Sequence, residues 1–148
     1  MANQILNLEQ FLEHRLAPWL QPSLLLFCRL WVSWVFFRAG LSKIQSWDST
    51  LFLFEYEYQV PFLSFKSAAY IATFAELSLP LILASGLYSR LSATLLFGFN
   101  IMAVVSYPIL WERGFYDHQL WGFMLMVVMI FGGGKWAVEQ LLKQKDHG

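Results

Sequence analysis

The chain has 148 residues, of which 57% are hydrophobic, 18% aromatic and 14% charged, and its mean hydropathy is +0.49. Soluble domains carry roughly 25% charged residues, so this composition predicts an integral membrane protein. Acidic and basic residues are equal in number, and no basic cluster is interleaved with aromatic residues, which excludes nucleic acid as a partner.

The first predicted element is an amphipathic segment within residues 1–22. Its leucine and isoleucine residues recur at i, i+3, i+7 and i+11, at Ile5, Leu8, Leu12 and Leu16. This spacing is typical of a helix that lies on a membrane face. The segment has neither a basic start nor a small-residue cleavage site, so we interpret it as retained and not as a cleaved signal peptide.

Four apolar stretches follow, at about 23–41, 67–85, 91–110 and 118–133. Each is close to the roughly 20 residues that a bilayer requires. They predict an all-α fold, an integral membrane four-helix bundle over residues 23–134. Aromatic residues at helical spacing between the first two stretches predict an interfacial helix there, because a lone strand beside a membrane has no pairing partner.

The distribution of lysine and arginine predicts the orientation of the chain. With the amino terminus inside, the inner segments hold more of these residues than the outer ones do. The positive-inside rule then places both termini in the cytoplasm, including a tail of residues 135–148.

Glu76 lies near the middle of the second apolar stretch, and Pro80 follows it four residues later. A carboxyl group in hydrocarbon costs several kcal/mol by most measures, so a chain that keeps one has a use or a partner for it. Pro80 has no N–H, which leaves the carbonyl of residue 76 without its helical donor. Glu76 is therefore the first candidate catalytic residue, and a purely structural ion pair with Arg29 or Arg38 is the alternative.

The first apolar stretch contains two arginines, and helical geometry separates their roles. Arg29 and Arg38 are nine residues apart, which places them on opposite faces of a helix. Arg29 shares a face with Lys43, whereas Arg38 lies close enough to the outer end to extend into the headgroups. We predict that Arg29 is the interior arginine and the neighbour of Glu76.

Further polar residues lie in and beside the third and fourth stretches. Asn100 is central in the third, where a buried amide more often bonds across helices than to a ligand. His118 could move protons or donate to a quinone carbonyl, but beside Asp117 it also fits the capped start of a helix. The predicted ligand-binding residues are Arg29, Lys43, Glu76, Asn100, Asp117, His118 and Trp121, with Glu76 and His118 as candidate catalytic residues.

Metal and haem sites are not predicted. The one cysteine, Cys28, excludes a disulfide within the chain, a CxxC pair and a thiolate metal cage. His14 and His147 fall outside the spans, so no pair of intramembrane histidines is present to ligate a haem from both sides.

An ordered set of motifs resembles the DoxX family of small four-helix bacterial membrane proteins. The set comprises Arg29, then FFRAGLSK (residues 36–43), Val60-Pro61, Glu76 and SGLYSR (residues 85–90). The resemblance covers roughly residues 24–134. The positions assigned structural roles are Gly40, Pro61, Pro80, Gly86 and Arg90. The ending with Asp117, His118, Trp121 and residues 132–134 resembles a DoxX subset associated with enzymes and small peptides of metal-stress gene clusters.

The resemblance implies a location in the bacterial inner membrane and three hypotheses for function. Founding family members are described as small subunits linked to quinone-coupled sulfur oxidation, and others resemble membrane parts of thiol and superoxide defence complexes. We therefore expect a membrane subunit or docking component of a redox or metal and oxidative-stress system. Its expected partners are the lipid bilayer, a protein of that system and a second copy of this chain.

The second hypothesis is a quinone-binding oxidoreductase subunit, in which Arg29 or His118 polarises a carbonyl and Glu76 moves a proton. The third is a small-solute or proton pathway, motivated by Glu76 and Pro80. No intrinsic cofactor is expected, and quinone is the candidate cofactor. The substrate, the partner and the oligomeric state do not follow from the residues.

Overall fold

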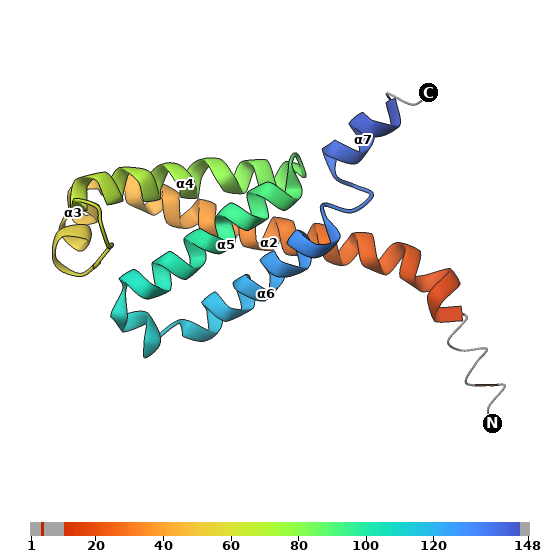
Figure 1. Cartoon of the computed structure of the whole chain (residues 1–148), viewed down its shortest axis with the longest axis horizontal. Coiled ribbons are helices and arrows are strands. Elements are labelled where there is room, and N and C mark those ends of the chain that lie inside the picture. Colours follow the sequence, from red (N-terminus) through yellow and green to blue (C-terminus); the bar gives the residue numbers. More distant parts are fainter. Residues whose placement is uncertain (1–3, 5–10, 146–148) are drawn as a thin grey trace.

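The computed structural model describes residue 4 and residues 11–145, and its regular elements are helices (Figure 1). The long helices are α2 (Ala17–Gln45), α4 (Phe65–Ser85), α5 (Ser89–Ser106) and α6 (Phe115–Phe131). The short ones are the π-helical turn η1 (Leu12–Leu16), α3 (Trp47–Tyr56), the 3-10 turn η2 (Pro108–Trp111) and α7 (Val138–Lys145). The all-α prediction is confirmed for these residues.

The four long helices pack around one core. α2 contacts α4 and α6, and α5 contacts the same two helices, so each long helix has two long neighbours. The centre is apolar and fully buried, and it comprises Cys28, Val32, Phe36, Leu83, Ala93, Leu96, Leu125 and Val128. Most other apolar side chains on the long helices point outward, as expected where the surroundings are lipid.

Three helical segments are long and apolar enough to cross a membrane. They are His14–Gln45, Phe65–Ser85 and Ser89–Ser106. The fourth predicted span corresponds to α6, which is apolar but shorter, at 17 residues. The composition of the helices thus agrees with an integral membrane protein.

The third and fourth spans have different ends from the predicted ones. α5 ends at Ser106 and not at Leu110, because the residue before Pro108 is held in an extended conformation. α6 begins at Phe115, three residues earlier than predicted, and ends where Gly132 takes a φ of 77°. The remainder of the third predicted span forms η2.

Residues 1–3 and 5–10 of the predicted amphipathic segment lie outside the described residues. Its described part is η1, which continues directly into α2, and Figure 1 shows this end of α2 extending beyond the other long helices. At the opposite end of the chain, the predicted tail contains α7.

The register between α2 and α4 positions the site. A Cβ on Gly40 of α2 would lie 2.9 Å from Leu77 Cδ2 and 3.0 Å from Glu76 Cβ, and Arg29 lies against Gly86 at the end of α4. α2 therefore ends before it reaches the first two turns of α4. That part of α4 is covered by α3 instead, through Phe54 packed on Ala68, Ala69 and Ala72. The predicted helix between the first two spans is confirmed as α3.

Candidate functional site

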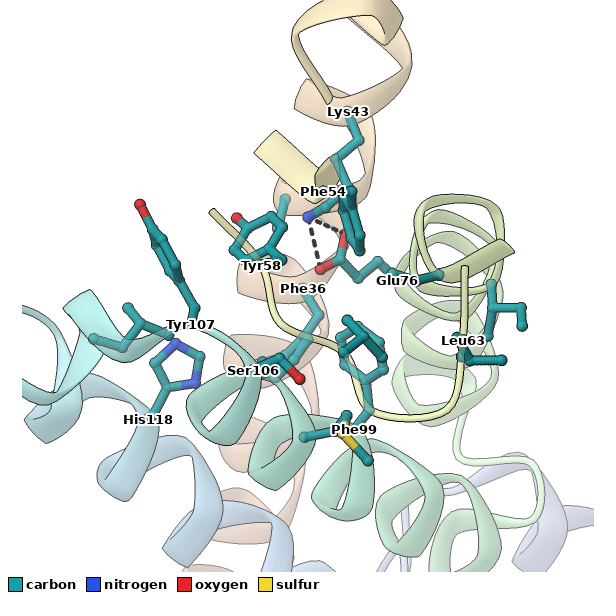
Figure 2. A pocket seen from close by; sticks show the side chains of 18 of the residues that line it. Phe36, Lys43, Phe54, Tyr58, Leu63, Glu76, Phe99, Ser106, Tyr107 and His118 are labelled. Atoms are coloured by element: carbon teal, nitrogen blue, oxygen red, sulfur yellow. Dashed lines mark hydrogen bonds and ion pairs between the residues drawn. The ribbon is translucent and has the colours of Figure 1, made fainter. Parts of the chain in front are cut away.

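Glu76 is paired with Lys43. The ammonium Nζ of Lys43 on α2 donates to both carboxylate oxygens of Glu76 on α4, at 2.9 Å to Oε1 and 2.7 Å to Oε2 (Figure 2). Glu76 is only 6% exposed. Gly40 of α2 has no side chain, so α2 and α4 approach closely there, and Lys43 reaches both oxygens of Glu76.

The predicted pairing of Glu76 with Arg29 is wrong. It followed from helical phase, which identified Arg29 as the interior arginine, and from the depth of Glu76 in its apolar stretch. The observed register moves Glu76 toward the end of α2, because α3 and not α2 covers the first turns of α4. Lys43, on the same face of α2 as Arg29, is the residue that meets the carboxylate.

The pair lies on the wall of a cavity of about 340 Å³. The cavity is lined by residues of α2, α4, α5 and α6, and α3 and the connection after it contribute further lining residues (Figure 2). Most of its wall is apolar or aromatic, including Phe36, Phe54, Phe99, Trp121, Leu63, Ile71 and Met102. A cavity of this volume, with apolar walls and a few polar groups, has the usual features of a small-molecule site.

Polar groups reach the cavity from several elements. The hydroxyl of Ser106 is buried and has no hydrogen-bond partner within the described part of the chain. Burial raises the pKa of Tyr58 to about 12, and Tyr107, Glu76 and Glu57 add to the effect. Tyr58 is thus a neutral phenol at physiological pH. Tyr107 donates its hydroxyl proton to Glu57 Oε2 at 2.9 Å, which raises the pKa of Tyr107.

His118 and Asn100 form a second polar pair at the cavity. Asn100 Nδ2 donates to the backbone oxygen of His118 at 2.9 Å, and Asn100 Oδ1 lies 2.7 Å from His118 Nδ1. The His118 ring meets the Trp121 ring at 4.7 Å between centroids, and both rings line the cavity. The alternative in which Asp117 and His118 cap the helix is wrong, because α6 begins at Phe115 after Gly114.

Arg29 is the interior arginine, as predicted, but it belongs to a separate cluster. It is 1% exposed, whereas Arg38 is exposed and lies over the Trp34 ring, 5.7 Å from its centroid. Arg29 Nη2 donates to the backbone oxygen of Trp136 at 3.4 Å, and its Nε and Nη1 have no partner within residues 11–145.

Turns and helix ends surround Arg29. Glu139 of α7 is a nearby opposite charge, and its Oε2 accepts from the backbone N–H of Ser89 at 3.0 Å. Gly86 has a φ of 74°, and a Cβ there would overlap Arg29 Nη1 and approach Ala137 Cα to 2.7 Å. We call Arg29, Gly86, Ser89 and Glu139 the turn cluster, and Lys43, Glu76, Asn100 and His118 the cavity cluster.

The remaining predicted site residues lie apart from the cavity. Asp117 is exposed on the first turn of α6. Pro80 is buried within α4, and Pro61 is in the exposed connection that Gln59 N–H ties to the backbone oxygen of Ser106. Arg90 lies beside Gly132. Within residue 4 and residues 11–145, no three His, Cys, Asp or Glu side chains gather as a metal site would require.

Comparison with protein families decides what kind of protein this is. The DoxX family model matches residues 24–108, more than half of the chain. The chain belongs to the DoxX family. The match covers α2 to α5, including both residues of the Lys43–Glu76 pair. Searches of curated proteins and of solved structures find no match to this DoxX protein.

Several cavity residues were not predicted from the sequence. Phe54 and Tyr58 come from α3 and the connection after it, and Ser106 and Tyr107 come from the end of α5. The signal that could have identified the first two is their i, i+4 spacing beside the Glu76 helix. Their rings stack edge to face at 4.6 Å, as such spacing on a helical turn allows.

Proposed function

We propose that this protein is a membrane subunit of a redox system and binds a quinone head group in the cavity beside Lys43 and Glu76. The observation that carries the proposal is the combination of an apolar, aromatic cavity with a lysine–carboxylate pair on its wall. A flat ring with polar substituents needs both features, since the walls accept the ring and the charged groups fix its oxygens. Lys43 replaces Arg29 in this role, because Arg29 lies in the turn cluster.

A bound quinone would supply two-electron, two-proton chemistry, with electrons exchanged through a partner protein. Lys43 has a third N–H that can donate to a ring oxygen while the other two hold Glu76. Glu76 can accept a proton without leaving its position, because Lys43 holds both of its oxygens. Ser106 and Tyr58 offer hydroxyl groups on the same wall.

Binding of a short-chain benzoquinone to the protein in mild detergent tests this proposal, with quenching of tryptophan fluorescence as the readout. Glu76→Gln leaves the shape of the side chain almost unchanged. It should weaken binding about tenfold, because one charged hydrogen-bonding group is lost. Ala103→Phe places a ring in the cavity wall and should abolish binding. The matched control is Gly98→Phe on the same helix, where nothing lies within 4 Å. Equal binding by all four proteins contradicts the proposal.

A docking function is the second candidate, and the exposure of Phe62 favours it. This side chain is fully exposed, at 103%, and its backbone has a φ of 65°, which is costly for a non-glycine residue. An aromatic side chain held outward in this way suits contact with a partner protein of a redox or metal-stress system. Phe62→Ser should then abolish co-purification of that partner while quinone binding is retained. A solute or proton pathway stays a prediction.

We also propose that all four long helices span the bacterial inner membrane with α3 outside and both termini in the cytoplasm. The lysine and arginine distribution supports this orientation. Cys28 is buried, so single cysteines introduced elsewhere can be labelled against little background. A membrane-impermeant maleimide should label Tyr116→Cys in intact spheroplasts and should label Lys135→Cys only after lysis. The reverse pattern contradicts the orientation.

A further inference from the structure

Asn100 uses both ends of its amide on one residue. Its Nδ2 lies 2.9 Å from the backbone oxygen of His118, and its Oδ1 lies 2.7 Å from His118 Nδ1. Asn100 is 4% exposed, so water does not compete for these contacts. Gly122 of α6 lies beside the amide, and a Cβ there would be in van der Waals contact with Asn100 Nδ2 at 3.4 Å.

These two contacts determine which nitrogen of His118 carries a proton. A backbone oxygen only accepts hydrogen bonds, so the amide group that faces it must be the NH₂. The other end of the amide is then the oxygen, which also only accepts. His118 Nδ1 must therefore be the donor. A neutral histidine has one N–H, so Nε2 is left with a free lone pair.

His118 lies between two hollows, and Nε2 is on the part of its ring that is turned away from Asn100. Asn100 and His118 line a separate hollow between α5 and α6. His118 also lines the cavity beside Glu76, together with Trp121. The ring edge that carries Nδ1 is directed at Asn100, so the edge that carries Nε2 is left available to a ligand. Figure 2 shows the His118 ring among the side chains around it.

We infer that Asn100 is a positioning residue, which holds His118 as a hydrogen-bond acceptor and thereby makes the cavity selective for a ligand that bears a hydroxyl group. The ligand class is an aromatic diol, the reduced form of a quinone, with one hydroxyl donating to His118 Nε2. This deepens the proposed function and rests on it for the ring, whereas the tautomer of His118 does not depend on any ligand.

Nitrogen NMR of the protein with isotopically labelled histidine tests the tautomer without a ligand. The His118 signals are those absent from His118→Phe. Nδ1 should show the shift of a protonated nitrogen and Nε2 that of an unprotonated one. Asn100→Asp should keep this pattern at a pH where its carboxyl group is protonated, because the O–H then donates to the backbone oxygen of His118 and the other oxygen accepts from Nδ1. Asn100→Leu should lose it. A wild-type signal from a protonated Nε2 with a bare Nδ1 overturns the inference, whatever the variants do.

Binding of a short-chain hydroquinone and of its dimethyl ether tests the ligand class. The two share a ring, but the ether has no hydrogen to donate, so wild-type protein should bind it about tenfold more weakly. Asn100→Leu should reduce that ratio toward one, and Asn100→Asp should retain it. Equal binding by wild type overturns the preference for a hydroxyl. If neither compound binds, both this preference and the proposed function are overturned. The NMR result then still decides the tautomer of His118.

Discussion

The cavity cluster and the turn cluster each contain a basic side chain from the same face of α2, but their surroundings differ. Lys43 donates to both oxygens of a carboxylate and lies on the wall of a cavity. Arg29 is enclosed by turns and helix ends, and two of its nitrogens have no partner among the described residues. A buried charge in a membrane protein therefore indicates a ligand site only where space adjoins it. The turns and helix ends around Arg29 leave no such space beside its charge in the described part of the chain.

The largest expected effect comes from filling the turn cluster. Gly86→Ala requires a left-handed φ of an alanine and places its Cβ against Arg29 and the backbone of Ala137. We expect it to lower the free energy of unfolding by about 3 kcal/mol or more, measured by denaturant titration in micelles. The control Gly98→Ala, with nothing within 4 Å, should be neutral or stabilise by up to about 1 kcal/mol. Equal stability of the two variants contradicts the close packing described for the turn cluster.

The next effect separates the two basic residues by giving both the same substitution. Lys43→Met leaves Glu76 buried without its cation and should cost about 3 kcal/mol of unfolding free energy. Arg29→Met removes a buried charge that has few partners, so the change should stay below about 1 kcal/mol. If both substitutions cost the same in the same titration, the distinction between the clusters is wrong.

A double-mutant cycle tests which basic residue Glu76 is coupled to. Lys43→Met combined with Glu76→Gln should show a coupling energy of about 1–3 kcal/mol, because the two side chains share both hydrogen bonds. Arg29→Met combined with Glu76→Gln should be additive to within about 0.5 kcal/mol. The opposite result would restore the pairing expected from the sequence.

The smallest effect concerns the loss of stability at alkaline pH, to which Tyr58 in the cavity wall contributes. The pKa of Tyr58 is raised to about 12 in the fold, whereas an unfolded tyrosine titrates near about 10. The unfolded chain therefore loses this proton first, and stability falls as pH rises through that window. Tyr58→Phe should show a shallower fall between these values than wild type, in melting curves recorded against pH. Tyr116→Phe, at a side chain 84% exposed, should follow wild type.

Helical phase and hydropathy predicted much of this structure. The apolar stretches locate the long helices, because burial in lipid or in a core depends on local composition. The position of Arg29 inside and Arg38 outside follows from nine residues of helical rotation alone. The α3 helix follows from its aromatic spacing.

The partner of Glu76 and the cavity could not be predicted in the same way. Both depend on how far α2 slides along α4, and that register is fixed by α3 packing on Ala68, Ala69 and Ala72. Such packing involves residues distant in sequence, so no local pattern encodes it. The same holds for Arg29, whose neighbours Trp136 and Glu139 come from the far end of the chain.

The shared face of α2 restricts where the chain can change in length. Arg29 and Lys43 are fourteen residues apart, which is about 21 Å along a helix. One residue inserted between them would turn Lys43 by about 100° and carry it away from Glu76, while Arg29 kept its place. Insertions and deletions in this stretch are therefore incompatible with the cavity.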